Sequence, residues 1–166
     1  MGAYKYSRIA GEDSAKAVGR ALPISTKTSK EVCRWIKGRD VAKAIVMLED
    51  VTKMKRAVPY FSAVKDIGHR KGDMRTGGFP QKAATHILDL VKSARHNAEH
   101  KGLNSKDLII WHTSAQQGPH TMRGGRRYRT AKRTHVEIIL KEEKKQAKKK
   151  EGKSKPSTPK KGEETQ

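Results

Sequence analysis

The segment from Gly118 to Arg133 holds the residues whose types point most directly to a chemistry. It contains a dense run of cations and one tyrosine, and it contains no carboxylate. A guanidinium group makes planar, bidentate contacts with phosphate, and guanidinium and aromatic rings stack on unpaired bases. The segment is therefore predicted to bind a nucleic acid. The residues expected to make the contacts are Arg123, Arg126, Arg127, Tyr128, Arg129, Lys132 and Arg133.

A second basic segment lies between residues 53 and 78. It shows neither helical nor strand periodicity, and a stretch of this length without a regular element usually has a functional role or an external partner. Lys82 follows it, at the start of the next predicted helix. We predict that these cations also contact nucleic acid. They are Lys53, Lys55, Arg56, Arg70, Lys71, Arg75 and Lys82.

The composition agrees with a polyanionic partner. The 166 residues carry a net charge of +21, and only 34% are apolar and 5% aromatic. A charge this positive attracts phosphate and opposes compaction. The sequence therefore predicts one small domain with exposed or partner-held extensions, and it argues against a soluble enzyme. We expect no cofactor and no homo-oligomer.

The cysteine content and the apolar patterning narrow the remaining classes. Cys33 is the only cysteine, which excludes an internal disulfide and a thiolate metal cluster. The first residues lack an apolar signal core, and no apolar run approaches the ~20 residues of a membrane span. A soluble, cytoplasmic protein is expected. Cys33 is expected to pack in the core, as are Trp35 and Trp111, which lie in apolar patterns rather than on a stacking surface.

One short motif could bind metal. His96, Glu99 and His100 match the H-x-x-E-H pattern of some zinc peptidases, and residues four apart share a helix face, as two zinc ligands must. The same residues also fit the exposed basic end of a helix, where the helix dipole favours cations. We favour the helix end and keep a zinc peptidase as the remote alternative.

Three helices are predicted between the N-terminal region and the basic segment at 118–133. The string Thr28-Ser29-Lys30-Glu31 fits a capping box, with Thr28 as N-cap and Glu31 reaching back, and this helix ends near Gly38. Asp40 is expected to cap the second helix. Pro80 suits the first turn of the third, which ends near Gly102.

Strands are predicted around the helices. Ala17 to Ile24 is expected to form a short one, with Pro23 favouring a sheet edge or a strand end. The apolar runs Leu108–Trp111 and Val136–Leu140 read as two further strands. Because these two would hold the ends of the basic segment together, they favour an ordered hairpin over the alternative of a solvated, disordered loop.

The order of these elements and several local strings closely resemble ribosomal large-subunit protein twenty-two, a universal family, in its archaeal–eukaryotic form. The resemblance covers about residues 12–142, and the insertion at 53–78 is typical of that branch. The matching strings are Ala42-Lys43-Ala44, Leu48-Glu49-Asp50-Val51-Thr52, Val58-Pro59, Gly78-Phe79-Pro80-Gln81-Lys82-Ala83-Ala84, Asn97-Ala98-Glu99, Lys101-Gly102-Leu103 and His135-Val136-Glu137-Ile138.

The resemblance implies an α+β fold in which three helices pack on a small three-stranded antiparallel sheet. It adds a long protruding basic β-hairpin at about residues 112–136 and a lysine-rich tail. Residues 1–142 would form a single RNA-binding ribosomal domain. Residues 143–166 would form a low-complexity basic tail.

The resemblance also implies a structural, non-enzymatic protein of the large ribosomal subunit. Its partners would be large-subunit rRNA, neighbouring ribosomal proteins and the nascent polypeptide, because the hairpin would line the peptide exit tunnel. The chain departs from the family at positions 129–133, where it reads Arg-Thr-Ala-Lys-Arg and the family commonly has Arg-Ala-x-Gly-Arg. A free-standing, chromatin-like nucleic-acid-binding protein is the alternative that explains the charge alone.

Overall fold

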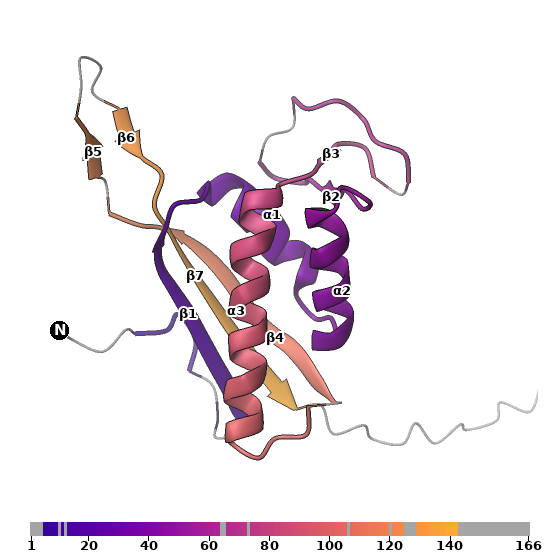
Figure 1. Cartoon of the computed structure of the whole chain (residues 1–166), viewed down its shortest axis with the longest axis vertical. Coiled ribbons are helices and arrows are strands. Elements are labelled where there is room, and N and C mark those ends of the chain that lie inside the picture. The colour runs from indigo at the N-terminus through magenta and orange to yellow at the C-terminus, as the bar shows by residue number, and fades with distance from the viewer. Residues whose placement is uncertain are drawn as a thin grey trace, which may run out of the picture.

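The computed structural model describes residues 5–9, 11, 13–63, 66–72, 74–105, 107–119, 121–124 and 129–142. It is an α+β structure with three helices and antiparallel sheets, as the sequence predicts (Figure 1). The elements are β1 (Ser14–Leu22), α1 (Thr26–Ile36), α2 (Val41–Thr52), β2 (Val58–Pro59), β3 (Gly77–Gly78), α3 (Gln81–His100), β4 (Leu108–Gln117), β5 (Thr121–Arg123), β6 (Arg129–Ala131) and β7 (Thr134–Glu142).

The main sheet has the strand order β1-β7-β4, with both neighbours antiparallel to β7. The central strand has the longest continuous buried stretch of the three, since Val136 to Leu140 are all buried. A strand buried on both faces needs such a run, because neither set of alternating side chains reaches water. β1 is an edge strand that ends before Pro23, as expected for a residue without an N–H to donate.

The helices cover one face of this sheet. α3 lies along β1 and β7, α1 packs against β4, and α2 packs against α3 (Figure 1). The core between them is aliphatic, and its largest fully buried side chains include Ile36, Leu48, Ile87 and Ile138. Burying each of these contributes about 1.5–3 kcal/mol relative to exposing it.

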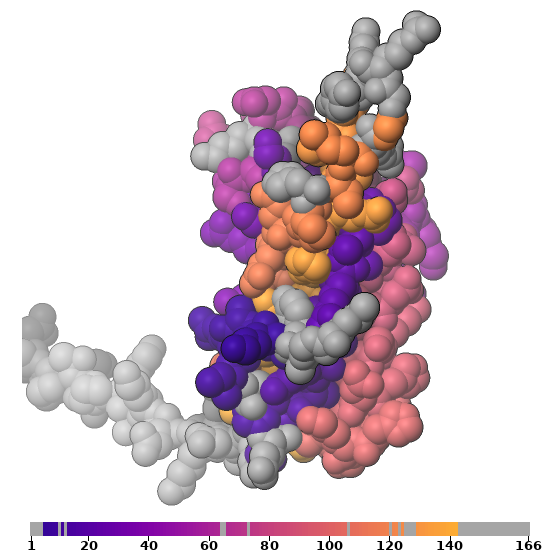
Figure 2. Space-filling model, turned by 90° about the vertical axis from the view of Figure 1, so that its left-hand side faces the viewer, coloured from indigo at the N-terminus to yellow at the C-terminus, as the bar shows by residue number. Residues whose placement is uncertain are grey.

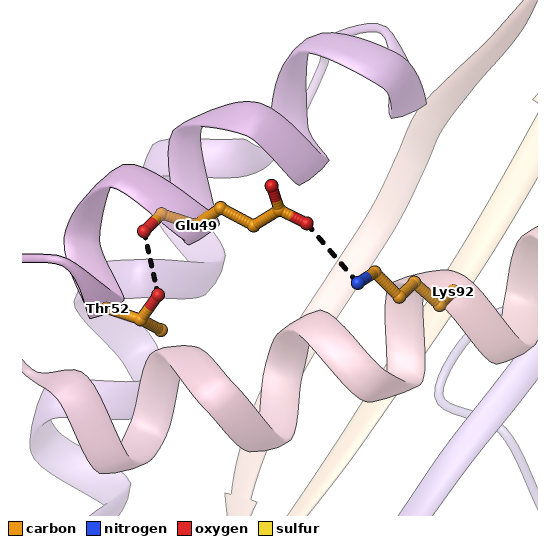
Figure 3. Close-up of polar contacts among 3 residues, drawn as sticks. All are labelled: Glu49, Thr52 and Lys92. Atoms are coloured by element: carbon orange, nitrogen blue, oxygen red, sulfur yellow. Dashed lines mark hydrogen bonds and ion pairs between the residues drawn. The ribbon is translucent and has the colours of Figure 1, made fainter.

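A polar contact also joins α2 to α3. Lys92 Nζ lies 3.3 Å from Glu49 Oε1, and the Thr52 hydroxyl donates to the Glu49 carbonyl at 2.7 Å (Figure 3). The charged side chains of this pair are about half exposed. Exposed ion pairs contribute only ~0–1 kcal/mol, so burial of the aliphatic core accounts for most of the stability of the helix packing.

The predicted ends of α1 and α3 are confirmed, whereas the predicted start of α1 is wrong. Gly38 and Gly102 follow α1 and α3 and have φ of +75°, a conformation that glycine adopts without steric cost. α1 begins earlier than predicted, with Ser25 as N-cap, and the Thr28 hydroxyl donates to the Ser25 carbonyl at 3.1 Å. The predicted capping box is therefore wrong, because Glu31 is too far along the helix to cap it and binds elsewhere.

The opposite face of the sheet is partly covered by residues 5–9. Glu137, fully buried on β7, accepts the Ser7 backbone N–H at 2.9 Å and the Gln116 side-chain amide at 2.8 Å. Ser7 Oγ also lies 3.0 Å from His112 Nε2. Figure 2 views this side of the molecule, where the indigo N-terminal residues lie against the strands. The N-terminal segment is thus attached to the sheet through polar contacts.

The two basic segments form short ladders of their own. β2 pairs with β3, which closes the insertion at 53–78, where the sequence shows no regular element. β5 pairs with β6 from Thr121↔Ala131 to Arg123↔Arg129. Both ladders lie at the same end of the molecule (Figure 1). Residues 143–166 lie outside the described part of the chain.

Candidate nucleic-acid interface

The base of the β5–β6 hairpin is continuous with the main sheet. The β4–β7 pairing runs to Gln117↔Thr134, and the Gly118 N–H then donates to the Arg133 carbonyl at 2.8 Å. The Arg133 guanidinium donates back to the Ala21 carbonyl at 3.3 Å. These bonds tie the start of the hairpin to β1 and to the sheet, so they set the direction in which its cations leave the body.

Two hollows flank the hairpin base. One, of about 390 Å³, lies between Lys132 and Arg133 and the first residues of α1, including Lys27. The other, of about 460 Å³, brings Lys132 together with Lys82 of α3, although 50 residues separate them in the sequence. The first turns of α1 and α3 both line this second hollow. Helix N-termini carry partial positive charge and unpaired N–H groups, which add to the attraction for phosphate.

The insertion contributes a separate set of cations. The Arg56 guanidinium lies 5.5 Å from the Trp35 ring centroid, and that of Arg70 lies 5.3 Å from the Phe79 centroid. The other four predicted cations of this segment are exposed, and they are Lys53, Lys55, Lys71 and Arg75. Within the described residues, none of these six cations forms an ion pair. All six are therefore available to an anionic partner.

A buried carboxylate holds the start of the insertion in place. Glu31 of α1 is fully buried and accepts the backbone N–H groups of Phe61, Ser62 and Ala63 at 3.0, 2.9 and 2.6 Å. The Ser62 hydroxyl donates to it as well, at 2.8 Å. Burial alone raises the pKa of Glu31, but these hydrogen bonds outweigh it and hold the pKa below its usual value of 4.5. The carboxylate is thus charged and satisfied.

Some predicted residues lie beyond what the structure describes. Arg126, Arg127 and Tyr128 fall outside the described residues, and only the backbone of Arg123 is described. Arg129 is exposed on β6. The structure therefore brings together Lys82, Lys132 and Arg133 at the hairpin base, and it places the insertion cations as a second group.

The sequence interpretation missed a cluster of cations around Trp35. Arg34, Lys37 and Arg39 join Arg56 around a third hollow, of about 760 Å³, which Trp35 and Phe61 also line. The signal in the sequence is a tryptophan with arginine one residue before it and four residues after it. Trp35 packs partly against the core, as predicted, and it also borders this hollow.

The prediction that Trp111 packs in the core is wrong. Its side chain is half-buried and does not belong to the core cluster, and the Arg8 guanidinium lies 5.6 Å from its ring centroid. A register shift between Ile110 and His112 interrupts the alternation of β4, and both Trp111 and its neighbour His112 contact the N-terminal segment, through Arg8 and Ser7. Cys33 is buried in the core as predicted, and burial raises the pKa of its thiol to about 11.

The H-x-x-E-H motif forms the exposed end of α3. Glu99 pairs with Arg95 at 3.1 Å and with His96 at 3.3 Å, and His100 is exposed. No group of three or more potential metal ligands occurs among the described residues. The carboxylate that a peptidase would use as its base is therefore paired with Arg95 and in contact with His96 on an open surface. A separate feature is that none of the described helices combines the length and the apolar composition of a membrane span.

The small α+β body with cations gathered on a hairpin and a loop defines a basic protein of the polyanion-binding class. Residues 17–144 match the model of the ribosomal protein L22p/L17e family. The chain belongs to this family, which is structural and non-enzymatic, so the expectation that it is not an enzyme is confirmed.

Curated relatives agree with the family match. The chain is 41% identical to the large ribosomal subunit protein uL22 of Methanococcoides burtonii, over 86% of this chain and 99% of the relative. It is 38% identical to that of Methanocaldococcus jannaschii, over 86% and 97% of the two chains. The corresponding protein of Archaeoglobus fulgidus is 41% identical over 69% and 76%. These organisms are archaea, which confirms the predicted archaeal type.

Proposed function

We propose that this chain is a structural protein of the large ribosomal subunit and that it binds large-subunit rRNA. The observation that carries the proposal is the likeness to uL22 of M. burtonii, which extends over 99% of that protein. An rRNA-bound protein of a cytoplasmic particle also accounts for the charge of +21 on a chain of this size. Membership of the family places the chain with the large subunit in the cytoplasm.

The proposed RNA contacts are made by two groups of cations. The Lys82–Lys132 hollow and Arg133 would bind phosphates at the hairpin base, where two helix N-termini add their positive ends. The insertion would bind a second stretch of backbone. The full proposed set is Arg123, Arg126, Arg127, Tyr128, Arg129, Lys132 and Arg133 from the hairpin, with Lys53, Lys55, Arg56, Arg70, Lys71, Arg75 and Lys82 from the insertion and α3.

The proposed mechanism is electrostatic and geometric. Lysine and arginine side chains neutralise phosphates and release condensed counterions, which supplies affinity. The body supplies direction, since the Gly118–Arg133 hydrogen bond and the β4–β7 ladder hold both strands of the hairpin where they leave the sheet. In this proposal residues 1–142 form the ribosomal domain, with three helices on the three-stranded sheet, and residues 143–166 form a basic tail.

The proposal extends to the exit tunnel. The hairpin at about 112–136 would protrude from the body and line the tunnel, which makes the nascent polypeptide a partner. Support comes from the family and from the placement of β5 and β6 away from the helices (Figure 1). Neighbouring ribosomal proteins would contact the remaining surface, and no homo-oligomer is proposed.

Co-sedimentation tests this function against a free-standing nucleic-acid binder. A tagged copy of the chain, expressed in a related archaeon, should sediment with large subunits in sucrose gradients and stay with them in high salt. Structural subunit proteins are held by many buried contacts, whereas a loosely bound cation dissociates as salt competes for phosphate. Recovery of the tagged chain at the top of the high-salt gradient would reject the proposal.

A further inference from the structure

We propose that the Trp35 hollow binds an unpaired base of the RNA. The charged and aromatic residues that line it are Arg34, Trp35, Lys37, Arg39, Arg56 and Phe61. This inference rests on the proposed function, because it names the kind of nucleotide that one part of the RNA-binding surface takes. The volume of the Trp35 hollow, about 760 Å³, is within the ~300–1,000 Å³ range of small-ligand sites.

The charges around the hollow suit a nucleotide. Four cations line it, and none of its described lining residues is acidic. Within the described residues, none of the four forms an ion pair with a carboxylate. Their charges are therefore available to the phosphates on either side of a bound base.

Guanidinium groups already lie over the aromatic rings of the hollow. The Arg34 guanidinium lies 5.0 Å from the Phe61 ring centroid, and Arg39 and Arg56 lie 5.9 and 5.5 Å from that of Trp35. Arg39 is further held by a hydrogen bond from its Nε to the Trp35 carbonyl at 2.9 Å. A base inserted here would meet ring faces and guanidinium planes, the two surfaces on which unpaired RNA bases stack.

The hollow is preorganised from inside the protein. Phe61 exposes 56% of its surface, which is unusual for a large apolar side chain. Its backbone N–H is held by the fully buried Glu31 at 3.0 Å, and β2 pairs with β3 directly before it. Trp35 is held on the other side by its packing against the core. An exposed ring on a fixed backbone loses little conformational entropy on binding.

A base explains the hollow better than a phosphate or an acidic peptide does. Phosphate needs only cations and N–H donors, and the hollow between Lys132, Arg133 and the start of α1 provides these without an aromatic ring among its described lining residues. An acidic peptide uses the cations and leaves the exposed Phe61 ring without a matching surface. A nucleotide uses both, because its base is a flat apolar ring and its backbone is anionic.

The test measures binding of the full chain to single-stranded hexaadenylate and to a short RNA duplex, by fluorescence anisotropy. A duplex keeps its bases stacked, so it reports the cations alone. Phe61→Ala removes a stacking ring, and Arg56→Lys keeps the charge but loses the planar group. The matched controls are Val46→Ala, which removes a side chain that is 58% exposed on α2, and Arg95→Lys, on α3 outside the hollow.

We expect Phe61→Ala to weaken hexaadenylate binding by about fivefold or more, the loss typical of one stacked base, and Arg56→Lys to weaken it as well. Duplex binding and both controls should stay within about twofold, as is usual for surface changes. Hexaadenylate that carries one 2-aminopurine should lose fluorescence on binding to the native chain and less on binding to Phe61→Ala.

Three outcomes would overturn the inference. The first is hexaadenylate binding by Phe61→Ala within about twofold of the native value. The second is an equal loss for the single strand and the duplex. The third is displacement of hexaadenylate by an acidic hexapeptide of equal affinity, which would assign the hollow to a protein. In each case the proposed function stands if the chain still sediments with large subunits in high salt, and it falls separately if the chain does not.

Discussion

The Glu31 carboxylate accepts the backbone N–H of Phe61 at 3.0 Å, although 30 residues separate the two in the sequence. One buried side chain thereby joins α1 to the basic insertion. Because the neighbouring N–H groups of Ser62 and Ala63 bind the same carboxylate, the start of the insertion is held at several points. This connection is the reason that the insertion has a defined path despite its weak sequence periodicity.

Replacing Glu31 with glutamine should loosen the start of the insertion. Glutamine keeps the size of the side chain but loses the charge and one acceptor, and hydrogen bonds to a charged group are worth about 1.5–3 kcal/mol. The amides of Phe61, Ser62 and Ala63 should exchange with solvent about tenfold to a hundredfold faster. Hydrogen exchange followed by NMR measures this. Glu99→Gln on the exposed end of α3 is the control, and unchanged exchange in Glu31→Gln would contradict the anchoring role.

The same carboxylate predicts an acid-sensitive contact. The pKa of Glu31 in the folded protein lies below its usual value of 4.5. Its contribution to stability is therefore complete above about pH 4.5 and is lost as the pH falls through the lower, folded pKa. The amide shift of Phe61 should titrate with a midpoint below 4.5 in the native chain and should not titrate there in Glu31→Gln. A midpoint above 4.5 would reverse the sign of this prediction.

His112 should make the attachment of the N-terminal segment sensitive to mild acid. Burial and the nearby cations Arg8 and Lys37 lower its pKa below 6.5, and Glu137 acts in the opposite direction. The unfolded chain then binds a proton more readily, so this contribution to stability is complete above about pH 6.5 and is lost as the pH falls through the folded pKa. The melting temperature should fall between about pH 7.5 and pH 5.5, and it should fall less in His112→Asn. Equal falls in both proteins would contradict the assignment; the exposed His100→Asn serves as the control.

Gly118→Ala should open the base of the hairpin without unfolding the body. An added Cβ would lie 3.0 Å from the Arg133 Cβ and 3.1 Å from its carbonyl carbon and oxygen, and backbone on the facing strand has little room to move. Overpacking of this kind typically costs about 1–3 kcal/mol. We expect weaker binding to large-subunit rRNA and an unchanged helical circular dichroism signal. Gly68→Ala is the control, since a Cβ there meets no described atom within 4 Å. Loss of the helical signal would instead make the hairpin base part of the core.

Removing the two lysines of the hairpin-base hollow should make RNA binding less dependent on salt. Lys82 and Lys132 line one hollow and would each neutralise a phosphate. Each lost contact should lower the slope of log affinity against log salt by about 0.7–0.9. The double variant Lys82→Ala/Lys132→Ala is compared with Lys43→Ala/Lys92→Ala, which loses the same charge from residues that already pair with carboxylates. Equal slopes in the two variants would show that the hollow does not contact phosphate.

Most of the local structure could be predicted from residues that are close together in the chain. Helical spacing of apolar residues, glycines after α1 and α3, and apolar runs at 108–111 and 136–140 act within a turn or a strand, so nearby residues are enough to predict them. The same local information misled the interpretation of Glu31. A capping box is a short-range pattern, and the tertiary fold offered this carboxylate three backbone donors from the insertion instead.

The grouping of the cations, in contrast, depends on the packing of elements that are far apart in the chain. Lys82 and Lys132 line one hollow because the starts of α1 and α3 lie beside the hairpin base, and the Trp35 hollow exists because β2 and β3 return the insertion to α1. These are pairings between residues far apart in the chain. They depend on how a common apolar core packs the elements, and the core leaves no periodic trace at the polar positions around it.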